Sequence, residues 1–260
     1  MLRIALITGG AGDLGLATAT RLAAGGVTVM LADLSLEAVE AAVATLPGDG
    51  HRAFAIDVTN ESQVCLTFDR IEAEAGHVAI LGQFAGIIDG AGPLNGKLVA
   101  DLDADVWRRV FDVNVFGTFL CVREMVRRYR AQPVADGRIV TFSSLAGQMG
   151  GYLAGAAYAA SKSAIIGFSK NIAREVAPLG MTVNIVSPGA IDSKMNREAA
   201  GLARDGGATV AAAAAVGGGT IPLGRKGSAD EVASLAAFLM SPEAAYITGQ
   251  TVAINGGSYM

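Results

Sequence analysis

The chain has 260 residues, of which 52% are hydrophobic and only 17% charged, and its formal net charge is −4. This composition can fill a substantial core and predicts a folded globular protein. The only basic cluster lies at residues 123–130, where its spacing suits a solvated helix face, so we expect no nucleic-acid partner. There is no secretory signal and no apolar run of the roughly 18 residues that span a bilayer, which favours a cytoplasmic protein without membrane contact. The two cysteines lack metal-ligand spacing, and we expect no metal site.

Strand-like and helix-like segments alternate along nearly the whole chain. Apolar runs predict strands at residues 4–8, 27–32, 53–56, 78–84, 138–142, 182–186 and 251–254. Helical periodicity predicts helices at residues 14–25, 35–46, 60–75, 103–130, 157–177 and 228–240. Seven strands with six intervening helices are typical of the α/β class, in a doubly wound parallel seven-stranded sheet or Rossmann fold. No Pro- or Ser-rich linker interrupts the pattern, so we expect a single domain over residues 1–260.

The segment 201–220 differs from the rest because it has low complexity and many glycines. It is either an exposed connection or part of a mobile substrate lid, which would extend over residues 190–225.

The first strand runs into TGGAGDLG, Thr8 to Gly15, and a helix-like segment follows. Glycines in this setting allow a tight turn and close approach of the backbone to a pyrophosphate, which meets the N–H groups at the helix N-terminus. Either Gly10 or Gly9 is the first glycine of the pattern. A carboxylate at Asp13 would repel a pyrophosphate, so we expect its side chain to turn away and cap the helix amides. The loop residues expected to contact the cofactor are Gly9, Gly12, Asp13 and Leu14.

The second strand ends at Asp33, eighteen residues after Gly15. An acidic side chain there can accept hydrogen bonds from both ribose hydroxyls of an adenosine and would repel a 2′-phosphate. The glycine loop and the residues just after Asp33 contain no Arg or Lys, which a 2′-phosphate would require. Asp33 therefore favours NAD over NADP, and its neighbour Leu34 is also expected to contact the cofactor. The alternative is that Asp33 only forms a turn or caps a helix ahead of Ser35.

The stretch YAASK places Tyr158 and Lys162 four residues apart, on the same face of a helix. A lysine charge beside a phenol lowers the phenol pKa, so that the phenol can exchange a proton near neutral pH.

With these motifs, the chain resembles the short-chain dehydrogenase/reductase family over essentially its whole length. The matching pieces occur in family order: the glycine loop, DV at Asp57, AG at Ala85, Asn114, SS at Ser143, Y-x-x-x-K, PG at Pro188 and a final INGG.

The resemblance implies a role for each matching position. Tyr158 would be the general acid/base, Ser144 would fix the substrate oxygen, Lys162 would hold the nicotinamide ribose and lower the Tyr158 pKa, and Asn114 would anchor a water in a proton relay. The nicotinamide would carry the hydride. The implied cofactor contacts are Asp57 and Val58 at the adenine, Ala85 and Gly86 at the adenosine and ribose, and Pro188, Gly189, Ala190, Ile191 and Ser193 near the nicotinamide.

Three positions depart from the usual pattern. Asp13 replaces a glycine, and the spelling of the loop fits the longer two-domain branch of the family, although 260 residues fit the short branch. QFAG, Gln83 to Gly86, replaces the usual NNAG and puts the anchoring of the strand in doubt. Ser144 lies fourteen residues before Tyr158, one more than usual, which a flexible connection can absorb.

The favoured function is an NAD-dependent dehydrogenase that interconverts a secondary alcohol and a ketone on a small hydroxy compound, such as a polyol or a sugar. One alternative is a 3-oxoacyl-thioester reductase, and another is a dinucleotide-binding sensor or scaffold without turnover. Relatives of this kind commonly associate through the helices that carry Asn114 and Tyr158, so we expect a homotetramer. The substrate wall is expected to include Met149, Tyr152, Leu153 and Met195, with the lid.

Overall fold

The computed structural model describes residues 3–89, 99–150, 155–195, 197 and 221–260. Its centre is a parallel sheet of seven strands in the order β3-β2-β1-β4-β5-β6-β9. The order reverses direction between β1 and β4, as in a doubly wound Rossmann sheet. The strands are β1 (Ile4–Thr8), β2 (Thr28–Asp33), β3 (Arg52–Ala55), β4 (Val78–Gln83), β5 (Arg138–Phe142), β6 (Thr182–Pro188) and β9 (Thr251–Ile254).

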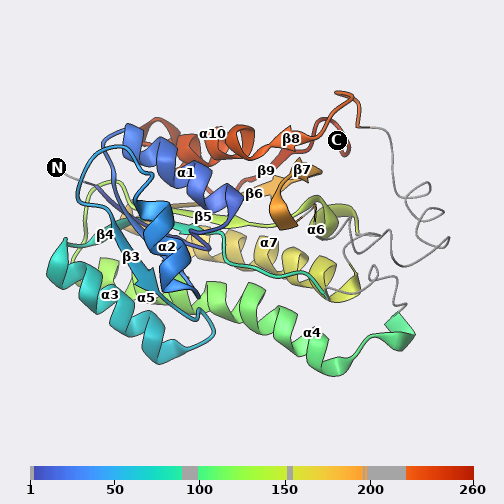
Figure 1. Ribbon diagram of the computed structural model, residues 1–260, viewed down its shortest axis with the longest axis horizontal. Helices are drawn as coiled ribbons and strands as arrows, with labels where there is room; N and C mark the ends of the chain where they lie inside the picture. Colours follow the sequence, from blue (N-terminus) through green and yellow to red (C-terminus); the bar gives the residue numbers. More distant parts are fainter. Residues whose placement is uncertain (1–2, 90–98, 151–154, 196, 198–220) are drawn as a thin grey trace.

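Helices cover both faces of this sheet (Figure 1). One face packs against α1 (Asp13–Ala24), α2 (Leu36–Val43) and α10 (Ala229–Leu239). The other face packs against α3 (Glu61–Glu74), α5 (Gly117–Ala131) and α7 (Ala156–Val176). The remaining elements are α4 (Ala104–Phe111), α6 (Leu145–Met149), the pair β7 (Ile191–Asp192) and β8 (Gly227–Ser228), and 3₁₀ turns at Val99–Asp101, Ala177–Leu179 and Pro242–Ala244.

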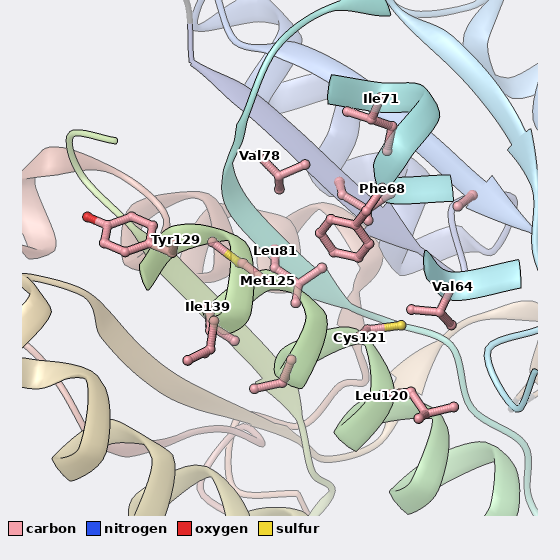
Figure 2. Packing of buried hydrophobic residues seen from close by; sticks show 14 of the residues in the cluster. Val64, Phe68, Ile71, Val78, Leu81, Leu120, Cys121, Met125, Tyr129 and Ile139 are labelled. Carbon is pink, nitrogen blue, oxygen red and sulfur yellow. The ribbon is translucent and has the colours of Figure 1, made fainter. Parts of the chain in front are cut away.

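The hydrophobic core lies between the sheet and these helices. Figure 2 shows how Phe68 of α3 and Met125 of α5 pack over Leu81 of β4 and Ile139 of β5, all of them almost fully buried. The strands are hydrophobic on both faces because both faces are covered, which explains why their sequences read as continuous apolar runs. The predicted α/β class, the seven-stranded sheet and the single domain are therefore confirmed.

The long helix predicted at residues 103–130 is three pieces. After α4, the turn Asp112–Phe116 is π-helical, and α5 then continues to Ala131. A π-helical turn inserts one extra residue, which shifts the side chains that follow it and frequently occurs at a functional position. Asn114 lies in the middle of this turn.

All seven strands are parallel, so their carboxyl ends lie along one edge of the sheet. The glycine turn follows β1 there, Asp33 ends β2 and Ser144 follows β5. A crevice at this edge, beside the point where the strand order reverses, is where open α/β sheets bind ligands. No helix within the described ranges combines the length and the apolarity that a membrane crossing requires.

Candidate active site

The turn after β1 is built so that only glycine fits at two of its positions. Gly9 has a φ of +66°, and a Cβ there would lie 2.6 Å from the backbone nitrogen of Ala85. A Cβ at Gly15 would overlap the carbonyl oxygen of Gly9. The first N–H groups of α1 follow directly, and the first amides of a helix have no intrahelical partner. The turn therefore offers backbone donors without side chains in front of them, as a pyrophosphate requires.

The prediction that Asp13 caps α1 is wrong. The N-cap is Gly12, with no side-chain cap, and Asp13 is already the first helical residue. Its Oδ2 instead accepts a hydrogen bond of 2.5 Å from the backbone nitrogen of Lys194 and lies 3.6 Å from the guanidinium of Arg197. A donor and a cation in the segment after β7 thus hold this carboxylate away from the helix amides.

Asp33 is placed at the end of β2, next to the glycine turn. Its Oδ2 accepts a hydrogen bond of 3.1 Å from the amide of Ala11, and its Oδ1 accepts one of 2.8 Å from the amide of Leu34. The side chain that caps α2 is Ser35, whose Oγ accepts from the amide of Ala38 at 3.2 Å. The alternative reading of Asp33 as the helix cap is therefore wrong, whereas its turn bond to Leu34 is present. Leu34 itself is highly exposed.

Asp57 and Val58 follow β3. The Asp57 Oδ1 accepts hydrogen bonds from the backbone nitrogen and the hydroxyl of Thr59, at 2.9 and 2.7 Å, and Val58 is buried. Asp57 thus shapes the turn at this edge of the sheet, and its contact with adenine stays a prediction.

The QFAG segment keeps β4 anchored. The buried Gln83 accepts a hydrogen bond of 3.1 Å from the hydroxyl of Thr8 through its Oε1, which links β4 to β1. The ring of Phe84 packs against that of Phe142, with centroids 4.0 Å apart, and so links β4 to β5. Gln83 and Phe84 stand where the usual pattern has two asparagines, and each of them forms its own contact between neighbouring strands.

The catalytic candidates meet where α6 and α7 pack together. Ser144 is the N-cap of α6 and its hydroxyl is hydrogen-bonded to the phenol of Tyr158, in the first turn of α7. The two helices touch at Gly147, where a Cβ would lie 2.7 Å from the carbonyl carbon of Lys162. The hydroxyl of Ser163 also donates to the carbonyl oxygen of Gly147 at 2.7 Å. This close packing fixes Ser144 relative to Tyr158 despite the additional residue between them.

Lys162 is buried beneath the phenol. Its Nζ lies 5.6 Å from the centroid of the Tyr158 ring and donates a hydrogen bond of 2.9 Å to the carbonyl oxygen of Phe142. Burial lowers the pKa of Lys162 to about 8. A buried ammonium donor at the carboxyl end of β5 can hold hydroxyl groups of a ribose.

The pKa of Tyr158 does not shift in the expected direction. Burial raises this pKa above its ordinary value, the hydrogen bond with Ser144 lowers it, and the charge of Asp89 raises it again. The predicted lowering by Lys162 is therefore wrong. Desolvation is the largest cause, because burial disfavours the phenolate, and burial also lowers the pKa of the lysine itself.

Asn114 connects the π-helical turn to the loop after β4. Its Oδ1 accepts from the amide of Ile87 at 2.8 Å, and its Nδ2 donates to the carbonyl oxygen of Ile87 at 2.9 Å and to the hydroxyl of Ser161 at 3.0 Å. A Cβ on Gly86 would lie 3.2 Å from Asn114 Oδ1 and 3.4 Å from Lys162 Nζ, so three of the predicted site residues converge there. The water relay through Asn114 stays a prediction.

The residues predicted near the nicotinamide follow β6. Gly189 donates its amide to the carbonyl oxygen of Ile254 at 2.9 Å, which ties this turn to β9. Pro188, Ile191 and Ser193 are buried, and β7 begins at Ile191. Met149 and Met195 are exposed, as a substrate wall would allow. Tyr152, Leu153 and most of the proposed lid, residues 198–220, lie outside the described residues.

The sequence analysis did not identify Asp89 as a residue of the site. Asp89, three residues after Gly86, is buried and its Oδ2 accepts a hydrogen bond of 3.0 Å from the amide of Ala157, next to Tyr158. The only sequence signal was an acidic residue within an apolar run after a strand. Over the described ranges, no group of three or more His, Cys, Asp or Glu side chains could hold a metal ion.

These features fit a dinucleotide. The glycine turn leaves space at the backbone, Asp33 lies where the ribose of an adenosine would be expected, and Lys162 lies beside the catalytic candidates.

Comparisons with known proteins agree with this geometry. The family model described as enoyl-(acyl carrier protein) reductase matches residues 9–259. The 3-oxoacyl-(acyl-carrier-protein) reductase of Escherichia coli is 36% identical over 258 residues, which cover 99% of this chain and 98% of the relative. A crystal structure of NAD⁺-bound xylitol dehydrogenase superposes with a TM-score of 0.88 at 33% identity, covering 98% of both chains. An actinorhodin polyketide ketoreductase variant with NADPH superposes with a TM-score of 0.87 at 28% identity, covering 99% of this chain and 97% of its own.

Proposed function

The chain belongs to the short-chain dehydrogenase/reductase family, an oxidoreductase family that uses a dinucleotide cofactor, and we propose that it is an NAD-dependent dehydrogenase of a small secondary alcohol. The substrate class we propose is a polyol, a sugar or a similar hydroxy compound, interconverted with its ketone. The observation that carries the proposal is the convergence of Ser144, Tyr158 and the buried Lys162 where α6 and α7 pack together.

Ser144, Tyr158 and Lys162 have separate roles in the proposed reaction. The hydroxyl of Ser144 holds the substrate oxygen, and the phenolic oxygen of Tyr158 takes the proton from that oxygen as the alcohol is oxidised. Lys162 donates hydrogen bonds to the ribose next to the nicotinamide and keeps a positive charge near the phenol. When bound, the nicotinamide supplies the acceptor for the hydride. In the reverse direction, Tyr158 returns the proton to the ketone oxygen.

The choice of NAD rests on Asp33. Its carboxylate lies at the end of β2 and would repel the 2′-phosphate of NADP, and neither residues 9–15 nor residues 34–38 contain a cation that could bind that phosphate. The similar structures divide on this point, since the xylitol dehydrogenase holds NAD⁺ and the polyketide ketoreductase holds NADPH.

The second candidate is a 3-oxoacyl-thioester reductase. The similarity to the Escherichia coli enzyme favours it, and so does the sequence YAASKSAIIGFSKNIARE of α7. Asp33 disfavours this candidate, because that activity normally uses NADPH. A third candidate, a dinucleotide-binding protein without turnover, has little support, since Asn114, Ser144, Tyr158 and Lys162 are all present.

The test is to incubate the purified protein with NAD and a panel of secondary alcohols, polyols and hydroxyacyl compounds, and to follow nicotinamide reduction beside a Tyr158→Phe control. Turnover with a polyol or another alcohol that disappears in the control supports the proposal. Reduction of a 3-oxoacyl thioester with strong NADPH preference would replace it with the second candidate. Binding of NADH without any turnover would favour the third.

We also propose a homotetramer, formed through the helices that carry Asn114 and Tyr158. The exposed aromatic side chains of Trp107 on α4 and of Phe116 in the π-helical turn that carries Asn114 support it, since aromatic residues are enriched at interfaces. Light scattering at micromolar concentration checks this, and a monomer would refute it. The cytoplasmic location stays a prediction.

A further inference from the structure

Asp89 lies in the loop after β4, and its side chain reaches the start of α7. Only 6% of Asp89 is exposed, and its Oδ2 accepts a hydrogen bond of 3.0 Å from the amide of Ala157. The amide of Tyr158 also acts on this carboxyl as a hydrogen-bond donor. A Cβ on Gly155 would overlap the carboxylate, so the chain has glycine where Asp89 approaches.

This contact supplies a cap that α7 lacks. The N-cap residue of α7 is Gly155, which has no side chain to accept a hydrogen bond from the first amides of the helix. Asp89 provides the acceptor from a different part of the chain. Because Tyr158 is the third residue of α7, the carboxylate holds the helical turn that carries the phenol.

The loop that carries Asp89 is itself held in place. Asn114 forms two hydrogen bonds with the backbone of Ile87, two residues before Asp89. The same Asn114 side chain donates to Ser161 of α7. The π-helical turn, the loop after β4 and the start of α7 are therefore joined by hydrogen bonds. Within this network, Ser161 donates to the carbonyl oxygen of Tyr158, and Asp89 accepts from the amide next to it.

The carboxylate also acts on the phenol electrostatically. Its negative charge raises the pKa of Tyr158, and among the described residues the other charged group beside the phenol is Lys162, on α7 itself. The uncharged Ser144 opposes Asp89 through its hydrogen bond. Among the described residues, Oδ1 of Asp89 has no hydrogen-bond partner, so no nearby donor neutralises this oxygen. A cap formed by an uncharged side chain would hold the helix without this effect.

We propose that Asp89 is a positioning residue for Tyr158, which caps α7 from the loop after β4 and fixes both the place and the electrostatic surroundings of the phenol. This inference rests on the proposed function, because Asp89 can affect catalysis in this way only if Tyr158 transfers the proton. It concerns residues outside the set of Asn114, Ser144, Tyr158 and Lys162, and it gives the loop after β4 a part in catalysis.

Two substitutions separate the cap from the charge. Asp89→Asn keeps an oxygen that can accept the Ala157 amide and removes the charge, whereas Asp89→Ala removes both. We expect Asp89→Ala to lower kcat about 10- to 100-fold with little change in KM for NAD, because small misplacement of a catalytic group costs rates of this size. We expect Asp89→Asn to keep most of kcat. In the direction of alcohol oxidation, the pH at which kcat/KM of Asp89→Asn rises should move to lower pH than in the wild type, because the phenolate is no longer beside a like charge.

The matched control is Asp103→Asn. Asp103 caps α4 through a hydrogen bond of 2.8 Å from the amide of Asp105, and it is exposed. It shares the capping role of Asp89 but has no contact with Tyr158 among the described interactions, so its pH profile should match that of the wild type. Unchanged kcat and an unchanged pH profile in both Asp89 variants would overturn the proposal, and so would an equal shift in Asp103→Asn.

A spectroscopic titration keeps this test separate from the proposed function. The near-ultraviolet absorbance of tyrosinate is recorded against pH for the wild type and for Asp89→Asn, each minus its Tyr158→Phe counterpart, which isolates Tyr158. Tyr158 should titrate at lower pH in Asp89→Asn, whether or not any alcohol is turned over.

If no substrate is found but this shift occurs, the proposed function fails and the positioning role stands. If turnover is found but the shift and the loss of kcat are both absent, the positioning role fails alone. Thermal melting of each variant verifies that it is folded, and Asp89→Asn carries the test if Asp89→Ala is not.

Discussion

The carboxylate of Asp33 accepts a hydrogen bond of 3.1 Å from the backbone amide of Ala11, so the end of β2 is tied directly to the glycine turn. One acidic side chain therefore supports the turn, and in the proposed function it also binds the adenosine ribose. With both roles, Asp33 should make the dinucleotide preference sensitive to a single position.

Asp33→Ser should lower kcat/KM for NAD about 10- to 100-fold, because hydrogen bonds to a charged acceptor contribute about 1.5 to 3 kcal/mol each. It should also raise the ratio of NADP to NAD activity, since the repulsion of the 2′-phosphate disappears. Steady-state kinetics with both dinucleotides measure the two effects. Asp49→Ser, in the exposed loop before β3, is the control and should change neither. An unchanged NADP-to-NAD ratio in Asp33→Ser would contradict this assignment.

The buried Lys162 should make the stability of the ligand-free protein depend on alkaline pH. Its pKa in the folded protein is lowered from 10.5 to about 8, so between these values the unfolded chain binds more protons than the folded one. Lys162 therefore adds stability as the pH increases above 8. The pKa of the buried Cys121, raised to about 12, has the opposite effect above the ordinary thiol value of 9, and the raised pKa of Tyr158 has it near and above 10. The comparison with a variant that lacks the lysine isolates the contribution of Lys162.

Between pH 8 and 10 the free energy of unfolding should thus gain about 2 to 3 kcal/mol from Lys162. Denaturant unfolding of the wild type and of Lys162→Met, measured across this range, checks the gain, which should be absent in the variant. Parallel pH dependence in the two proteins would mean that the lysine is not desolvated.

Ser144→Ala should act on both the substrate and the phenol. The variant loses the hydroxyl proposed to hold the substrate oxygen, and kcat should fall about 100-fold or more. The Ser144 hydrogen bond lowers the pKa of Tyr158, so without it the rise of residual activity with pH should move to higher pH. Ser234→Ala, whose exposed hydroxyl on α10 donates to the carbonyl oxygen of Asp230, is the control and should keep the wild-type profile. A shift of the Ser144→Ala profile to lower pH would contradict the role of this hydrogen bond.

The sequence predicted the sheet well because its strands are short apolar runs between glycine-rich turns. The bounds of β1, β5 and β9 agree residue for residue with the prediction. The break of the helix at Asp112–Phe116 was not predicted, since DVNVF continues the helical periodicity. The side chain of Asn114 in this turn bonds Ile87 and Ser161, which are distant in the chain and which helical periodicity does not reveal.

The candidate site was predicted where local motifs define it and was incomplete where distant segments meet. Ser144, Tyr158 and Lys162 come together as the motifs indicated. The pKa of Tyr158 was predicted in the wrong direction, because spacing along a helix shows a neighbouring charge but not the burial that outweighs it. Asp89 was missed because its partner Ala157 lies 68 residues away in the chain.

Asp13 shows the same limit, since its partners belong to a segment about 180 residues further along the chain. Its bond to the amide of Lys194 ties the start of α1, where the pyrophosphate should bind, to the residues after β7, which the family resemblance places near the nicotinamide. Asp13→Ala should therefore weaken NADH binding by only a few fold, because a partly exposed hydrogen bond contributes about 1 kcal/mol.

Asp13→Asn should weaken NADH binding less than Asp13→Ala. Its amide oxygen can still accept from Lys194, and only the 3.6 Å ion pair with Arg197 is lost. Fluorescence titration with NADH of the wild type and both variants measures the differences. A large gain in affinity in Asp13→Ala would show instead that the carboxylate faces the pyrophosphate in the bound state and repels it, and that the contact with Lys194 breaks when the dinucleotide binds.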